Sequence, residues 1–298
     1  MYIIGINAYH ADSSACIIKD QNLIFAIEEE RLRRIKHWAG FPILSIKNCL
    51  EVAKINLSDV DYICINSNPK VNIIKKIIHI LKYRPSIKLI INKFRNKKKN
   101  QNIKSIIKRE FTNDEFRGKI INIEHHDAHL ASTFFVSPFK EACVVSIDGF
   151  GDFTSTAWGF GHNTEIEVKE RIHFPHSLGI FYQSITQFLG FKKYGDEYKV
   201  MGLAPYGKPI YQEKIKQLID IKDDGTFRLD QKYFNYATGL TMTNDKFHKI
   251  FGQKPRDPNK DQITQFHMDI ASSIQNLTEE IMIKLVKGIR DTYGIKNL

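Results

Sequence analysis

Two histidines and one aspartate form the pattern best suited to metal chemistry in this 298-residue sequence. His125 and His129 are four residues apart, so on a helix both imidazoles project from one face and can bind a single divalent ion. Asp148 ends an apolar stretch, where a carboxylate is costly unless it serves a ligand, a metal or a helix cap. Because this donor set suits Fe(II), Mn or Zn better than Mg or Ca, we predict a transition-metal site. Histidines used only for packing are the alternative that the spacing leaves open.

The glycine-rich segment after this aspartate has the composition of a phosphate-binding turn. Gly149 and Gly151 could present backbone N–H groups to phosphate oxygens. Further hydrogen bonds could come from the hydroxyls that follow, those of Thr154, Ser155 and Thr156. A plain β-hairpin turn would use the same residue types, and the pattern does not separate the two interpretations.

An equivalent polar turn lies near the N-terminus. Asp12 and Ser13 are candidates for binding nucleotide or phosphate there, although short polar residues also form ordinary turns. His10 is the first catalytic candidate, because an imidazole titrates near neutrality and can transfer a proton or stabilise a transition state. Lys36 is the second, since it could reach a phosphate together with His37; a solvated helix end is the alternative.

These candidates stand at the ends of predicted strands and helices. Alternating apolar residues predict strands at 2–7, 13–18 and 23–27, a helical segment at 28–37, a helix at 43–55 and a strand at 62–66. A second cycle predicts strand 119–124, helix 125–135, strand 142–148 and antiparallel strand 154–160. Further on we predict helix 176–190, a glycine-punctuated connection at 193–207 that lines a cleft, and an amphipathic helix at 261–293 that ends at Gly294. The order of these elements indicates an α/β fold.

The net charge of +11 is concentrated in one segment. Residues 69–110 contain eleven lysines and three arginines against one glutamate. Within residues 68–100, apolar and basic residues repeat at helical spacing and are interrupted by Pro85, which predicts two amphipathic helices with their apolar faces on the core. A solvated basic insertion is favoured over a nucleic-acid or anionic-membrane surface.

Two further features concern the compartment. The four cysteines are scattered without C-x-x-C spacing, which is typical of buried free thiols. No basic leader precedes an apolar segment, and no uncharged stretch of 18 residues occurs, so we expect a cytoplasmic protein without a membrane span.

Six ordered motifs resemble the carbamoyltransferase family that includes nodulation-factor, cephamycin and tobramycin O-carbamoyltransferases. The motifs are GINAYHADSSACIIKD, IEEERLRRIKHWAGFP, HHDAHLASTFF, SIDGFGDFTSTAWGFG, FPHSLGIFYQSITQFLGF and YGDEYKVMGLAPYG. The resemblance is close over residues 2–42 and 121–207, loose in the terminal helix and weak in the basic insertion.

This resemblance implies the N-terminal part of an actin-like ATPase (RNase H-like) domain, with a mixed sheet flanked by helices. In the family a YrdC-like domain follows and makes carbamoyl-adenylate from carbamoyl phosphate and ATP. The actin-like domain then transfers the carbamoyl group to a hydroxyl, here that of a sugar or small molecule that the sequence does not identify.

The resemblance also assigns roles to individual residues. His125, His129 and Asp148 match the metal-binding positions of the family. The bound ion, most consistent with Fe(II), would coordinate the phosphate of the adenylate. His10 matches a histidine of the transfer site that would orient or deprotonate the acceptor, and Lys36 matches a lysine of the same region.

The family continues where this sequence stops. We expect residues 1–298 to form the N-terminal portion of the actin-like domain, with the basic helical insertion at 69–110 and the helix at 261–295 leading to a second lobe. Four features of the family would then be absent: a strand, a glycine-rich adenosine-binding loop, a further aspartate ligand for the metal, and the YrdC-like domain. That absence predicts an open sheet edge, an apolar surface suited to self-association or a partner chain, and a weakly held metal.

Two other functions remain open at this point. One is a non-catalytic or partner-dependent truncated homologue. The other is tRNA modification of the threonylcarbamoyl type, to which the basic insertion lends slight support; nucleic acid is not the expected partner because the HADSSAC and EEERLRRIKH motifs do not fit that family.

Overall fold

The computed structural model describes residues 1–83, 103–112, 114–239 and 241–298. Its backbone contacts divide the chain into two compact units. The first contains Met1–Val71 and Ile87–Ala128, and the second contains Asn72–Ser86 and His129–Leu298.

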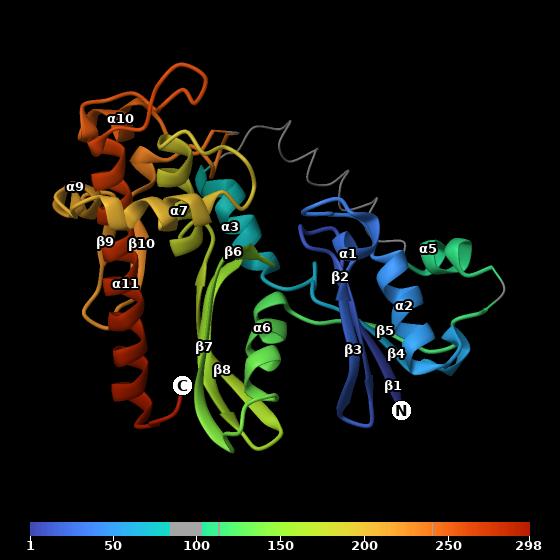
Figure 1. Ribbon diagram of the computed structural model, residues 1–298. Coiled ribbons are helices and arrows are strands. Elements are labelled where there is room, and N and C mark those ends of the chain that lie inside the picture. Colours follow the sequence, from blue (N-terminus) through green and yellow to red (C-terminus); the bar gives the residue numbers. More distant parts are fainter. Residues whose placement is uncertain (84–102, 113, 240) are drawn as a thin grey trace. The chain divides into compact units, whose positions relative to one another are not determined.

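A five-stranded mixed sheet forms the centre of the first unit (Figure 1). Its order is β3-β2-β1-β4-β5, with β1 Tyr2–Asn7, β2 Ser14–Lys19, β3 Asn22–Glu28, β4 Tyr62–Ile65 and β5 Lys119–Asn122. The first three strands are antiparallel neighbours, whereas β4 and β5 run parallel to β1. Alternate residues such as Ile4, Ile6 and Ile63 are buried, as expected for one covered face of a pleated sheet. The predicted mixed α/β fold is therefore confirmed.

The first unit contains the helices α1 Glu29–Arg33, α2 Ile43–Ala53 and α5 Ile103–Glu110, with a 3₁₀ turn η1 at Leu57–Asp59. Helices α2 and α5 contribute buried apolar residues to the core, whereas the buried residue of α1 is Glu29. On α2 the buried residues Ile46, Cys49 and Leu50 repeat at three- and four-residue spacing and face the core. On α5, which follows the two helices predicted around Pro85, Ile107 is buried in the same core.

A buried carboxylate fixes the start of α2. Glu29 is fully buried and accepts hydrogen bonds from the Leu44 backbone N–H (3.2 Å) and from the Ser45 N–H and hydroxyl (both 2.8 Å). Arg33 Nε donates to the same carboxylate over 2.7 Å. Because helix N-termini carry unpaired N–H groups and a partial positive charge, Glu29 caps α2 from outside the helix.

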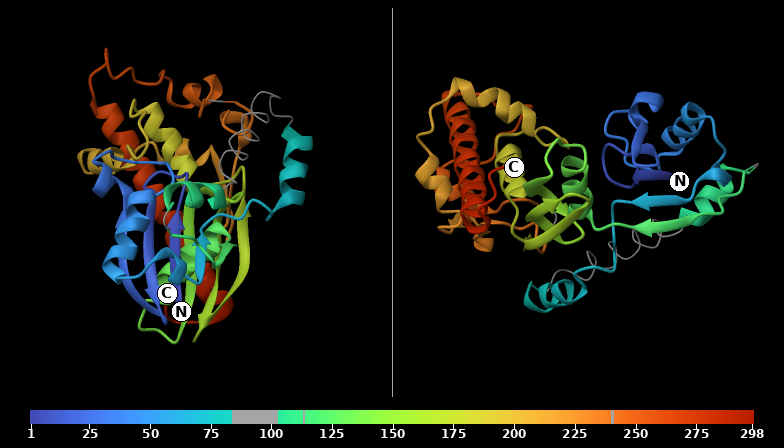
Figure 2. Two further views of the ribbon diagram at one scale, coloured as in Figure 1. Left: turned by 90° about the vertical axis from the view of Figure 1, so that its right-hand side faces the viewer. Right: turned by 90° about the horizontal axis from the view of Figure 1, so that it is seen from below.

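The second unit contains an antiparallel sheet, a small hairpin and a long helix. The sheet order is β6-β7-β8, with β6 Glu141–Gly151, β7 Thr154–His162 and β8 Glu165–His173, and the hairpin pairs β9 Ile219–Ile221 with β10 Phe227–Leu229. The helices are α3 Ile73–Tyr83, α7 Leu178–Phe188, α8 Glu197–Leu203, α9 Gln212–Lys216, α10 Asp245–Phe251 and α11 Gln265–Tyr293, with 3₁₀ turns η2 Ala204–Tyr206 and η3 Gln231–Tyr233. α11, red in Figures 1 and 2, lies against β6, α7, α8 and α9 and ends at the left-handed Gly294, as predicted.

Three sequence predictions need correction. Gly149 and Gly151 belong to β6, and the turn lies at Asp152–Phe153, where both φ angles are positive (48° and 76°). The segment 193–207 is largely helical, as α8 and η2, and strand β8 was not predicted at all. The apolar side chains of α3 are exposed and do not pack on the core. The second helix predicted for the basic segment falls within residues 84–102, which lie outside the described residues.

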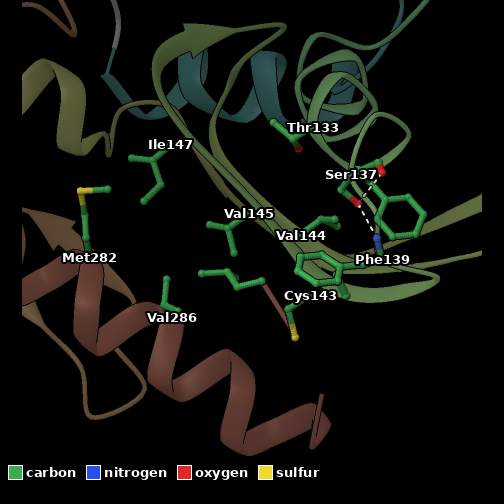
Figure 3. Close-up of a pocket in the computed structure, with 12 residues that line it drawn as sticks. Thr133, Ser137, Phe139, Cys143, Val144, Val145, Ile147, Met282 and Val286 are labelled. Atoms are coloured by element: carbon green, nitrogen blue, oxygen red, sulfur yellow. Dashed lines mark hydrogen bonds between the residues drawn. The ribbon is translucent and has the colours of Figure 1, made fainter. Parts of the chain in front are cut away.

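One edge of β6 borders an apolar groove of about 430 Å³ (Figure 3). Val145 and Ile147 of β6 face Met282 and Val286 of α11 across it, and all four residues line the groove. Near its end, the Cys143 N–H donates to the Asn297 carbonyl over 2.9 Å. The expected apolar surface beside the sheet edge is therefore present.

Two other expectations concern cysteines and membranes. All four cysteines are free thiols. None of the described helices is both long and apolar enough to cross a lipid bilayer.

Candidate metal centre

Helix α6 and strand β6 carry the three predicted metal ligands. α6 spans His125–Phe134, so His125 and His129 lie one turn apart on one continuous helix, as predicted. Glu124 starts this helix, because its carboxylate accepts the Asp127 N–H over 3.0 Å. Asp148 lies on β6, in a stretch where the register with β7 shifts between Ile147 and Gly151.

The ligand atoms of these residues form a compact cluster. One atom each from His125, His129 and Asp148 lies within 4.8 Å of the others. His129 Nε2 is 3.5 Å from Asp148 Oδ2, and these two side chains are 47% and 41% exposed, whereas His125 is buried. Bonds of about 2.0–2.2 Å to a shared ion place ligand atoms within about 4.4 Å of one another. The donor set therefore fits a first-row divalent metal after a small side-chain adjustment.

Backbone contacts fix the position of Asp148. Its Oδ1 accepts the Gly149 N–H over 2.6 Å, and its backbone carbonyl accepts the Ser177 hydroxyl over 2.9 Å. Gly179 packs so closely that a Cβ at that position would lie 2.9 Å from the Asp148 backbone. Asp148 thus presents Oδ2 toward His129 from a restrained backbone.

His10 lies beside His125, at the turn between β1 and β2. Its ring centroid is 5.8 Å from that of His125, and the His10 side chain is exposed. His125 Nδ1 lies 3.3 Å from the carbonyl of Asn66, directly after β4. The sequence reasoning missed Asn66, although a polar residue at the carboxyl end of a parallel strand is a signal of a ligand-binding edge.

A second cluster forms at the same turn. His37 Nδ1 is 2.9 Å from Asp12 Oδ1, and the His37 N–H donates to Glu30 Oε2 over 3.0 Å. Both Asp12 and His37 have positive φ angles (63° and 56°), so the two loops meet in constrained conformations. Lys36 is exposed in this loop, and it is the neighbouring His37 that contacts Asp12. Sequence reasoning missed Glu30.

The predicted phosphate-binding hydroxyls are buried, and those of Ser13, Thr154 and Ser155 are hydrogen-bonded within the fold, whereas Thr156 Oγ1 has no hydrogen-bond partner among the described residues. The Ser13 hydroxyl lies within hydrogen-bond distance of the carbonyls of His10 (3.0 Å) and Gly40 (2.8 Å). The Ser155 hydroxyl donates to the His176 carbonyl over 2.6 Å, and Thr154 Oγ1 lies 3.3 Å from Asn72 Nδ2. Phosphate binding by these residues, by Asp12 and by the two β6 glycines stays a prediction.

Comparison with known proteins identifies the family. The family model described as carbamoyltransferase N-terminus matches residues 2–298. The chain belongs to this carbamoyltransferase family. An uncharacterized protein of Synechocystis sp. is 41% identical to this chain, in an alignment that covers 100% of this chain and 49% of the relative. The nodulation protein NolNO of Sinorhizobium fredii is 31% identical over 98% of the chain and 40% of its own length. The chain thus spans about half the length of these relatives or less.

A solved structure of low similarity is also found. YeaZ from Pseudomonas aeruginosa aligns with a TM-score of 0.32 at 10% identity, covering 58% of this chain and 66% of YeaZ.

Proposed function

We propose that the chain forms the N-terminal part of an O-carbamoyltransferase that transfers a carbamoyl group from carbamoyl-adenylate to a hydroxyl of a sugar or small molecule. The observation that carries this proposal is the group of potential metal ligands His125, His129 and Asp148, together with the contact between the rings of His10 and His125. Family membership supports carbamoyl transfer as the reaction. In the complete protein, ATP and carbamoyl phosphate would supply the adenylate.

His125, His129 and Asp148 would hold the divalent metal, for which Fe(II), Mn or Zn are the suitable ions. When bound, the ion supplies a Lewis acid for the phosphate leaving group. His10 would accept a hydrogen bond from the acceptor hydroxyl and take its proton as the carbamoyl carbon is attacked. The second cluster would position this turn, because Asp12 lies two residues from His10 and is held by His37. Lys36 could neutralise anionic substrate at the same loop.

Replacing His10 by asparagine is expected to lower carbamoyl transfer by about 10²–10⁴-fold, the usual contribution of a general base. Asparagine keeps a polar side chain of similar size but cannot take the proton. The measurement is transfer of labelled carbamoyl groups by the protein in its full length, with the exposed His162 changed to asparagine as a control. Undiminished transfer by the His10→Asn variant would remove His10 from the reaction.

We further propose that activity depends on polypeptide beyond this region, either in the same chain or in a partner. The relatives are about twice as long, and the groove beside β6 offers an apolar surface next to a strand edge. The Cys143 N–H points to that edge, toward Asn297. Because side chains and N–H groups alternate along a strand, the N–H groups of Val145 and Ile147 point the same way. An added strand could pair there.

Hydrogen exchange measured by NMR tests this arrangement. In the 298-residue chain, the amides of Val145 and Ile147 are expected to exchange at least ~10-fold faster than that of Val144, which points toward β7. Addition of the remaining polypeptide should then slow the two amides selectively. Equal protection of all three amides in the chain alone would contradict an open edge.

A further inference from the structure

Helix α3 turns its aliphatic face away from the rest of the second unit. Six large side chains on this eleven-residue helix are exposed, by 39–74%, namely Ile73, Ile74, Ile77, Ile78, Ile80 and Leu81. At 3.6 residues per turn they occupy a continuous arc of about 160°. None of them belongs to a hydrophobic cluster of the described residues. Such a concentration of exposed aliphatic side chains marks an interaction surface.

The opposite face of α3 explains this orientation. His79 is 8% exposed, and its ring packs edge-on against Phe153 (5.7 Å between centroids) and Phe174 (4.6 Å) and stacks on Tyr83 (4.7 Å). Phe153 lies in the turn after β6, and Phe174 follows β8. These aromatic contacts hold the polar side of the helix inward, so its aliphatic side faces outward.

Cations flank the aliphatic arc. Lys75 and Lys82 lie at one border and Lys76 at the other, as helical spacing requires. Lys75 and Lys82 also line a cavity of about 560 Å³ together with Arg171, Lys222 and Arg228, and Glu170 is the acidic residue among the described lining residues. Ile78 belongs both to the exposed arc and to the cavity rim. An apolar surface and a basic cavity therefore adjoin.

Two histidines that line this cavity add no positive charge to it at neutral pH. Burial lowers the pKa of His173 to about 4, and the charge of Lys75 contributes in the same direction. Burial likewise lowers the pKa of His176 to about 4, with contributions from Arg228 and Lys82. Both rings are neutral at pH 7, so the positive charge of the cavity comes from lysine and arginine and persists across physiological pH.

We propose that α3 docks on a membrane surface rich in anionic phospholipid, with its aliphatic face in the acyl boundary and the basic cavity on the headgroup phosphates. Interfacial helices combine an apolar face with flanking lysines in this way, and basic residues near anionic lipid strengthen binding. A nucleic-acid partner would use the cations but leave six aliphatic side chains in water. This association concerns a surface of the second unit and is independent of carbamoyl transfer.

Vesicle co-sedimentation of the full chain tests the proposal. Binding is expected to vesicles that contain phosphatidylglycerol and to be at least ~10-fold weaker with phosphatidylcholine alone. The double variant Ile74→Asp/Leu81→Asp should lose this binding by at least ~10-fold. Both residues are more than two-thirds exposed, at 74% and 70%, so the fold should tolerate the change. The matched control is Val136→Asp/Ile210→Asp, which alters aliphatic residues that are 76% and 65% exposed elsewhere in the same unit.

A second variant tests the cations. Lys75→Gln/Lys82→Gln should weaken binding to phosphatidylglycerol by roughly fivefold per lysine and reduce its salt dependence. Four outcomes would overturn the proposal: no binding to anionic vesicles, equal binding to both lipids, equal loss in the control variant, or a concentration-dependent dimer of the chain that only the Ile74→Asp/Leu81→Asp variant abolishes. The last result would assign the face to a second copy of the chain.

Discussion

Replacing His129 by alanine is expected to weaken divalent-metal binding by ~100-fold or more. Loss of a residue that only supports a ligand usually lowers metal affinity by about 10–100-fold, and loss of a direct ligand should lower it further. His129 is 47% exposed and holds no part of the core, so the fold should persist. Isothermal titration with Zn²⁺ and Mn²⁺ measures the effect. His162→Ala serves as the control, since this histidine is exposed at the end of β7 and contacts Asn163 instead.

The companion variant Asp148→Asn separates charge from geometry. Its side chain keeps one oxygen for the Gly149 N–H but loses the negative charge beside His129. Affinity should again fall, because a neutral amide oxygen is a weaker metal ligand than a carboxylate. If His129→Ala and Asp148→Asn both bind Zn²⁺ as tightly as the unaltered chain, the α6 and β6 cluster is not a metal site.

Replacing Glu29 by glutamine is expected to lower the free energy of unfolding of the first unit by about 2–4 kcal/mol. The neutral amide weakens the charged hydrogen bond with Arg33 and turns one acceptor oxygen into a donor beside the N–H groups at the start of α2. Glu28→Gln is the matched control: the neighbouring carboxylate is 43% exposed and pairs with Arg31 over 3.3 Å, so its loss should change stability by less than about 1 kcal/mol.

The two tryptophans allow the units to be followed separately. Trp38 belongs to the first unit and lies under Arg33, 4.5 Å from its guanidinium carbon, whereas Trp158 is buried in the second. Urea unfolding of a Trp158→Phe background, followed by fluorescence, therefore reports on the unit that contains Glu29. An unchanged midpoint for Glu29→Gln would show that this carboxylate does not hold the α1 and α2 junction.

Local periodicity predicted the elements that carry the site, because strands and helices with one buried face repeat in sequence. Most of the predicted elements lie at or near their predicted positions, among them β1 to β3, α2, β4, α6, β7 and α11. The predictions failed where contacts between residues distant in sequence determine the local structure. Gly149 and Gly151 extend β6 because Asp152 and Phe153 take the left-handed turn, and α3 is turned outward by its aromatic face.

The candidate site was partly visible in the sequence. The spacing of His125 and His129 predicts that both lie on one face of a helix. The apolar residues before Asp148 predict a strand, and a carboxylate after such a strand is a candidate ligand. The contact of His37 with Asp12 joins loops 25 residues apart, and no local pattern predicts which residue of the charged run reaches the turn. The burial of Ser13 and Ser155 is likewise set by long-range packing and not by their polar character.

We propose that His125, His129 and Asp148 jointly bind one divalent metal. Anomalous diffraction from crystals grown with Mn²⁺ or Zn²⁺, collected above and below the metal absorption edge, tests it directly. We expect one strong peak within about 2.0–2.3 Å of the nearest nitrogen or oxygen of all three side chains. An anomalous map with no peak there, or with the ion bound instead by Asp12, Glu30 and His37, would contradict it.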